Sequence, residues 1–132
     1  MLAWLLGEPS GEIARAALAT AEAVTASDLT LIECDRALIR GVATGDVTPA
    51  EAARLRRVLN QAAARWNLVP IGAEVVGRVR RPFPAEPLRA LDAIHLASAL
   101  LTVADVPELT VLSLDRRIRK AAQELGLTRT PA

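Results

Sequence analysis

Apolar residues along the chain alternate between helical spacing and short continuous runs, which predicts helices connected by short β-strands. The first apolar run stops at Gly7 and Pro9, so we expect a helix of one or two turns there. Further helices are predicted at 12–21, 27–41, 48–66, 73–81, 91–101 and 115–126. Short strands are predicted at 23–27, 67–71, 108–114 and 127–131. Ser27 is expected to cap its helix and Gly41 to lie near that helix's end.

The segment that starts at Thr48 carries the clearest helix signals in the chain. Thr48 is a favourable N-cap, Pro49 suits the first helical position, and Glu51 completes a capping box. The apolar positions repeat at helical spacing and predict one buried face, formed by Leu55, Val58, Leu59, Ala62 and Trp66. Arginines occupy the other faces, so this helix is expected to pack one face against the core and expose the others to solvent.

Strands that alternate with helices indicate an α/β fold, a three-layer sandwich in which helices flank a short parallel sheet. The chain has 132 residues, 52% of them hydrophobic, which suits a single domain over residues 1–132 with its own core. Ligands of such folds bind beyond the carboxyl ends of the strands, where loops turn into helices. Acidic residues after strands and at helix starts are therefore the candidates for chemistry.

Asp115 follows the strand "VLSL" directly and opens a helix. An aspartate there is a good N-cap, which typically contributes about 1 kcal/mol. Capping the helix and binding a ligand are compatible roles for Asp115, because a capping carboxylate at the end of a strand also faces the ligand-binding edge.

Asp92 is the second residue of the apolar stretch "LDAIHLASALL", which also holds the only histidine, His95. Asp92 is a possible N-cap, but the capping box is incomplete because His95 stands where Glu or Gln is required. His95, Ser98 and Thr102 form a narrow polar stripe on a helix that is otherwise apolar, and we expect such a helix to be buried. A carboxylate at the start of this helix needs a partner. We interpret His95 itself as a packed, half-buried histidine rather than a metal ligand.

Glu33 lies in the middle of the helix "LTLIECDRAL". One interpretation is a surface ion pair with Arg36, three residues on. The other is that Glu33 faces protein, because Leu29 and Ala37 lie on the same side of the helix. If Glu33, Asp92 and Asp115 meet, their mutual repulsion requires cations to offset it.

Composition restricts which cation such a site would take. Cys34 is the only cysteine and His95 the only histidine, which excludes a disulfide framework and zinc sites of the Cys/His type. Carboxylate ligands point instead to a hard cation, magnesium or manganese. The 16 basic and 15 acidic residues nearly balance, so overall charge does not argue for nucleic acid. The lone cysteine and the absence of a signal peptide or an apolar span predict a cytoplasmic protein without a membrane segment.

Three stretches, "ASDLTLIECDRAL", "LRALDAIHLASAL" and "VLSLDRRIRKAAQELGL", resemble in order and spacing the motif blocks of the PIN-domain family. The closest resemblance is to VapC-type toxins of toxin–antitoxin pairs. It implies a magnesium- or manganese-dependent endoribonuclease that cuts structured RNA and is held inactive by a cognate antitoxin. Glu33, Asp92 and Asp115 match the family's catalytic and metal-binding acids. Ser113 matches the hydroxyl that often accompanies the last acid. Arg116 and Arg117 are expected at the mouth of such a site, in position to meet substrate phosphate, and Arg119 and Lys120 are expected at the solvated surface.

The family opens with a central strand that ends in an aspartate, whereas this chain begins at Met1, inside the first motif block. We therefore expect the first strand and first acid to be absent from these residues. Either a longer protein supplies them, which we favour, or the gene is truncated and its product impaired as a nuclease. In the second case the chain is an inactive module that binds an antitoxin or RNA, and its helical hairpin of residues 29–66 offers an apolar face for a homodimer. A receiver-like signalling domain fits less well, because the paired acids after a first strand are lacking.

Overall fold

The computed structural model describes all residues 1–132 and confirms an α/β fold with short parallel strands flanked by helices. The helices are α1 (Leu2–Leu5), α2 (Glu12–Thr20), α3 (Asp28–Thr44), α4 (Pro49–Ala63), α5 (Ala73–Val79), α6 (Ala90–Val103) and α7 (Arg116–Glu124), with a 3-10 turn at Pro9–Gly11. The strands are β1 (Thr25–Ser27), β2 (Asn67–Val69), β3 (Thr110–Leu112) and β4 (Thr128–Thr130). Every predicted element is present.

The strands form two separate parallel pairs, so the prediction of one short sheet was wrong in this respect. β1 pairs with β2, with Thr25 opposite Asn67, and β3 pairs with β4, with Thr110 opposite Thr128. Each strand has a single partner, so no strand joins the two pairs. In β1, Thr25 and Ala26 are half-buried and Ser27 is buried.

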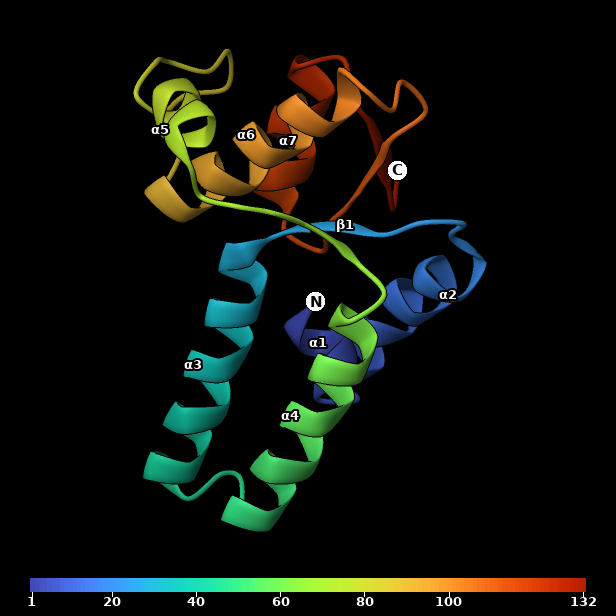
Figure 1. Cartoon of the computed structure of the whole chain (residues 1–132), viewed down its shortest axis with the longest axis vertical. Coiled ribbons are helices and arrows are strands. Elements are labelled where there is room, and N and C mark those ends of the chain that lie inside the picture. The colour runs from blue at the N-terminus through green and yellow to red at the C-terminus, as the bar shows by residue number, and fades with distance from the viewer.

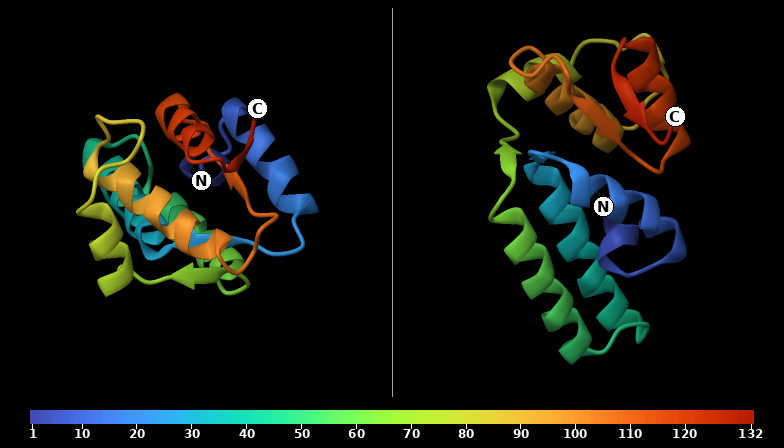
Figure 2. Two further views of the ribbon diagram at one scale, coloured as in Figure 1. Left: turned by 90° about the horizontal axis from the view of Figure 1, so that it is seen from above. Right: turned by 90° about the vertical axis from the view of Figure 1, so that its right-hand side faces the viewer.

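One layer of helices lies on each side of β1 and β2 (Figures 1 and 2). In Figure 1 helices α5, α6 and α7 lie above β1, and the α3–α4 hairpin and α1 lie below it. The upper layer has its own core, of eight buried residues: Val75, Phe83, Ala93, Leu96, Ala97, Ala121, Ala122 and Leu127. The lower layer has a second core, of six: Leu5, Cys34, Leu38, Ala52, Leu55 and Leu59. Burial raises the pKa of the Cys34 thiol, so this cysteine is a packing residue.

Local signals place the helix starts but not every helix end. Ser27 caps α3 by accepting a hydrogen bond from Leu29 N, and Thr48 caps α4 by accepting one from Glu51 N. The predicted capping box is incomplete, because the Glu51 carboxylate binds Arg54 instead of reaching back to the cap. That interaction lowers the pKa of the Glu51 carboxyl.

The end of α3 lies one turn beyond the predicted position. The helix continues past Gly41 to Thr44 and stops at Gly45, whose φ of 81° is the left-handed conformation that glycine adopts without strain. Gly41 has a different role, because a β-carbon on it would lie 2.9 Å from Val47 Cγ2. Its missing side chain lets the turn after α3 fold back against the helix.

Candidate active site

Glu33 and His95 form the contact that joins α3 to α6. The Glu33 Oε1 to His95 Nε2 distance is 3.0 Å, and this bond links positions 62 residues apart. The expected alternative, a surface pair between Glu33 and Arg36, is absent. His95 is half-buried and hydrogen-bonded, which confirms its interpretation as a satisfied histidine.

The other polar residues of the α6 stripe are satisfied within their own helix. Ser98 Oγ donates to the Ile94 carbonyl, and Thr102 Oγ1 donates to the Ser98 carbonyl, each at 2.9 Å. The hydroxyls of Ser98 and Thr102 are therefore satisfied by backbone carbonyls of α6, and they do not form a row of ligands. The helix is less buried than expected, because the Leu91 side chain remains 50% exposed at its start.

Asp92 lies in the first turn of α6, but it is not the helix N-cap. The cap position belongs to Arg89, whose side chain makes no capping bond. Asp92 is half-buried and forms no side-chain hydrogen bond or ion pair within the chain. Its place in the first turn of α6 puts it near the helix N-terminus, which attracts anions by about 0.3–1 kcal/mol. Asp92 is therefore a carboxylate free to accept a ligand from outside the chain.

Asp115 is the N-cap of α7, as predicted. Its Oδ1 accepts a hydrogen bond of 2.7 Å from Arg117 N, and its second carboxylate oxygen has no partner in the chain. Ser113 Oγ accepts a hydrogen bond of 3.2 Å from Asp115 N, so the serine holds the backbone of the acid. Asp115 is exposed and carries one oxygen available for a ligand.

Arg119 has a role that the sequence interpretation missed. It was expected at the solvated surface, but it is half-buried and its Nη1 donates to the Ser113 carbonyl at 3.0 Å. Arg119 lies one turn after Asp115 on α7, and this spacing alone was the available signal. Arg116 and Arg117 are exposed and form no ion pair, so both guanidinium groups are free to bind an anion.

The structure does not gather the predicted acids into a ready-made cage. No three acidic, histidine or cysteine side chains of the chain converge closely enough to hold one metal ion. The Glu33 carboxylate binds His95 and is therefore not free to bind a metal ion together with Asp92 and Asp115. The donors that remain, Asp92 and the free oxygen of Asp115, are of the type that a hard cation takes. Magnesium is commonly bound by one or two carboxylates and completes its shell with water and phosphate, so each of these two carboxylates is a ligand of the type that such an ion takes.

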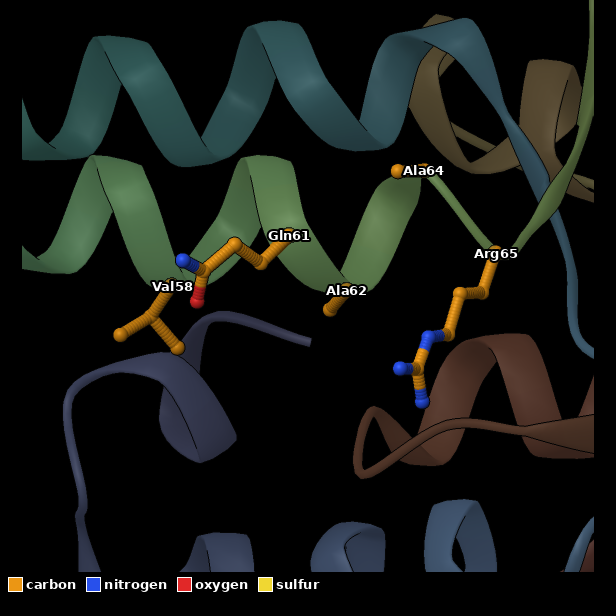
Figure 3. A pocket seen from close by; sticks show the side chains of 5 residues that line it. All are labelled: Val58, Gln61, Ala62, Ala64 and Arg65. Carbon is orange, nitrogen blue, oxygen red and sulfur yellow. The ribbon is translucent and has the colours of Figure 1, made fainter.

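One open concavity of the molecule lies away from these residues. It is an open hollow of about 550 Å³ at the end of α4, lined by Val58, Gln61, Ala62, Ala64 and Arg65 (Figure 3). No carboxylate, histidine or cysteine lines it, so it offers no metal ligand.

The model of the PIN domain family matches residues 1–124 of the sequence. The chain belongs to the PIN domain family. A search of curated proteins finds no significant match. PIN domains are typically metal-dependent nucleases that use divalent ions, and the match includes the elements that carry Glu33, Asp92 and Asp115. No helix of the chain is long and apolar enough to cross a membrane.

The cap and the free oxygen of Asp115 can be separated by mutation. Asparagine caps helices about as well as aspartate, so Asp115→Asn is expected to leave the free energy of unfolding within about 0.5 kcal/mol of the wild type. Asp115→Ala removes the acceptor for Arg117 N and is expected to cost about 1 kcal/mol. Urea unfolding of the three proteins measures the difference. Equal destabilisation by both substitutions would contradict the assigned cap.

Proposed function

We propose that this PIN domain is a magnesium- or manganese-dependent endoribonuclease, the toxin of a type II toxin–antitoxin pair that cuts structured RNA. The observation that carries the proposal is the half-buried Asp92 carboxylate, which has no partner within the chain, in a domain of a nuclease family. A half-buried carboxylate without a partner in the chain is available to bind a cation, which is the usual partner of a carboxylate away from bulk water.

Asp92 and Asp115 are the residues that would hold the ion. Such an ion orients a phosphodiester and activates water for in-line attack when it is bound. The Ser113 hydroxyl and the Arg119 guanidinium fix the turn that carries Asp115, from its two sides. Arg116 and Arg117 supply free guanidinium groups for the phosphates of the substrate.

Glu33 has a positioning role in this proposal. Its bond to His95 keeps α3 against α6, which is the helix that carries Asp92. The family resemblance assigns Glu33 to the metal directly, and the two roles differ in one respect: as a ligand, Glu33 has to leave His95. Substrate or metal binding would then break the 3.0 Å contact between the two side chains.

The second candidate function is an impaired PIN module that binds an antitoxin or RNA without cutting it. Two observations favour it: no three metal donors converge, and Glu33 is already occupied by His95. A cognate antitoxin and a cytoplasmic location belong to both proposals.

Metal titration followed by thermal unfolding separates the two functions. A ligand that binds only the folded state stabilises it by RT ln(1 + [L]/Kd), about 2.7 kcal/mol at 100 times Kd. We expect millimolar Mn²⁺ to raise the melting temperature of the wild type but not that of Asp92→Asn. Asp105→Asn, a change at an exposed acid beyond the other end of α6, serves as the control and should respond like the wild type. No shift for the wild type would favour the binding module.

A further inference from the structure

The segment from the end of α5 to the start of α6 concentrates positive charge on a chain that is otherwise nearly neutral. Residues 78–89 hold four arginines and a single acid, whereas the whole chain has 16 basic and 15 acidic residues. In Figure 1 the loop of this segment rises to the top of the molecule beside α5, at the opposite end from the tip of the α3–α4 hairpin. A local excess of one sign attracts partners of the opposite sign even when the net charge of the protein is low.

Arg78 ties this segment to the upper core. Its guanidinium lies over the Phe83 ring, 3.8 Å from the ring centroid, and its Nη1 donates to the Arg81 and Pro82 carbonyls at 3.2 and 3.4 Å. Phe83 itself is 4% exposed and belongs to the upper core. The backbone that carries the other arginines is therefore held in place, which reduces the conformational freedom that is lost when a ligand binds.

Both carboxylate oxygens of the only acid in the segment are bound by the backbone. Glu86 accepts a bond of 3.0 Å from Phe83 N on one oxygen and a bond of 2.7 Å from Leu88 N on the other. These two bonds lower the pKa of the Glu86 carboxyl. Because Glu86 forms no ion pair with an arginine, it leaves the guanidinium groups of the segment available.

Three arginines of the segment have exposed side chains with no ion pair or hydrogen bond in the chain: Arg80, Arg81 and Arg89. A guanidinium presents its donors in a planar fork that matches the oxygens of a phosphate. Arg89 directly precedes α6 and stands three residues before Asp92, so the segment ends beside the candidate metal ligand.

We infer that residues 80–89 bind the phosphate backbone of the RNA strand that reaches Asp92, through Arg80, Arg81 and Arg89. This inference rests on the proposed function and names the surface along which the substrate lies. A polyanion fits better than a protein partner, because none of the large exposed apolar side chains of the chain lies in this segment. Protein interfaces are usually held by large side chains buried at their centre, whereas a phosphate backbone requires charge and hydrogen-bond donors.

RNA binding in EDTA tests the inference without any cleavage. The wild type is titrated into a labelled structured RNA at several salt concentrations, and the slope of log K against log [salt] reports how many phosphates the protein neutralises. The variant Arg80→Gln/Arg81→Gln/Arg89→Gln is expected to bind at least about tenfold more weakly at about 100 mM salt, and its slope should become shallower by about 2–3. Circular dichroism checks that each protein is folded, and the three exposed side chains can be replaced without disturbing the core.

The matched control removes three positive charges from the α3–α4 hairpin. Arg36, Arg40 and Arg57 are also exposed and form no ion pair, so Arg36→Gln/Arg40→Gln/Arg57→Gln makes the same change in net charge. Its slope should stay within about 0.5 of the wild type. Equal losses in the two variants, an unchanged slope in the first, or no RNA binding by the wild type would each overturn the inference. Displacement of the RNA by polyglutamate as effectively as by unlabelled RNA would also overturn it and assign the surface to acidic proteins.

The same measurements separate this inference from the nuclease proposal. RNA that binds through the three arginines but stays intact in Mn²⁺ would contradict the nuclease proposal and support the RNA-binding surface. A thermal shift with Mn²⁺ that depends on Asp92, together with no RNA binding in EDTA, would contradict the surface alone.

Discussion

Replacing Asp92 with asparagine is expected to lower metal-dependent RNA cleavage by about 100-fold or more. Asparagine keeps the shape of the side chain and removes its charge, and even the partners that orient metal ligands are worth 10–100-fold when they are lost. Because Asp92 makes no bond within the chain, the folded state loses only the attraction of the α6 N-terminus, about 0.3–1 kcal/mol. The measurement is the initial rate of cleavage of a labelled structured RNA in Mn²⁺, with the variant confirmed as folded.

The control for this prediction is Asp105→Asn. Asp105 is exposed, follows the other end of α6 and forms no side-chain bond, so its loss should leave the rate within about twofold of the wild type. Undiminished cleavage by Asp92→Asn would exclude this carboxylate from the chemistry. Equal losses in both variants would instead indicate a general effect of charge on RNA binding.

Replacing Leu96 with alanine is expected to lower the free energy of unfolding strongly. Leu96 is 1% exposed and lies in the upper core, where its side chain is surrounded by residues of three helices. Truncating a buried leucine to alanine removes apolar burial and leaves a cavity, which together cost about 2–5 kcal/mol. Unfolding in guanidinium chloride, analysed by linear extrapolation, measures the loss.

Leu91→Ala makes the same chemical change on the same helix, at a site that is 50% exposed. Because little apolar surface is lost there, we expect a change of no more than about 0.5 kcal/mol. If both substitutions cost the same, the α5–α6–α7 cluster is not the core that stabilises this half of the molecule.

The parts of the fold that the sequence predicts well are the helix starts, which depend on residues close together in the chain. Thr48 and Pro49 start α4 where expected, because a cap and its helix are neighbours in the chain. The same holds for Ser27 before α3 and for Asp115 before α7. The error at the end of α3 has a tertiary cause, since Gly41 is needed for the close approach of Val47 and not for a left-handed turn.

Local sequence signals do not predict contacts between residues that are distant in the chain. The Glu33–His95 bond joins residues 62 positions apart on two helices. Leu29 and Ala37 beside Glu33 hint that it faces protein, but they do not name His95 as its partner. The division of the strands into two pairs depends on which backbone edges meet, and a three-residue strand has no pattern that specifies its partner. Rules of position point to Asp92, at the start of a helix, and to Asp115, directly after a strand, and their role as metal ligands stays a prediction.

The measurement that tests the central claim most directly is RNA cleavage by the purified chain with and without a divalent ion. A labelled structured RNA is incubated with the wild type in Mn²⁺, in Mg²⁺ and in EDTA, with Asp92→Asn beside it in each condition. The nuclease proposal predicts discrete internal cuts by the wild type that appear with either metal and disappear both in EDTA and in the variant. Intact RNA in every condition, from protein that is folded, would contradict it and favour the binding module.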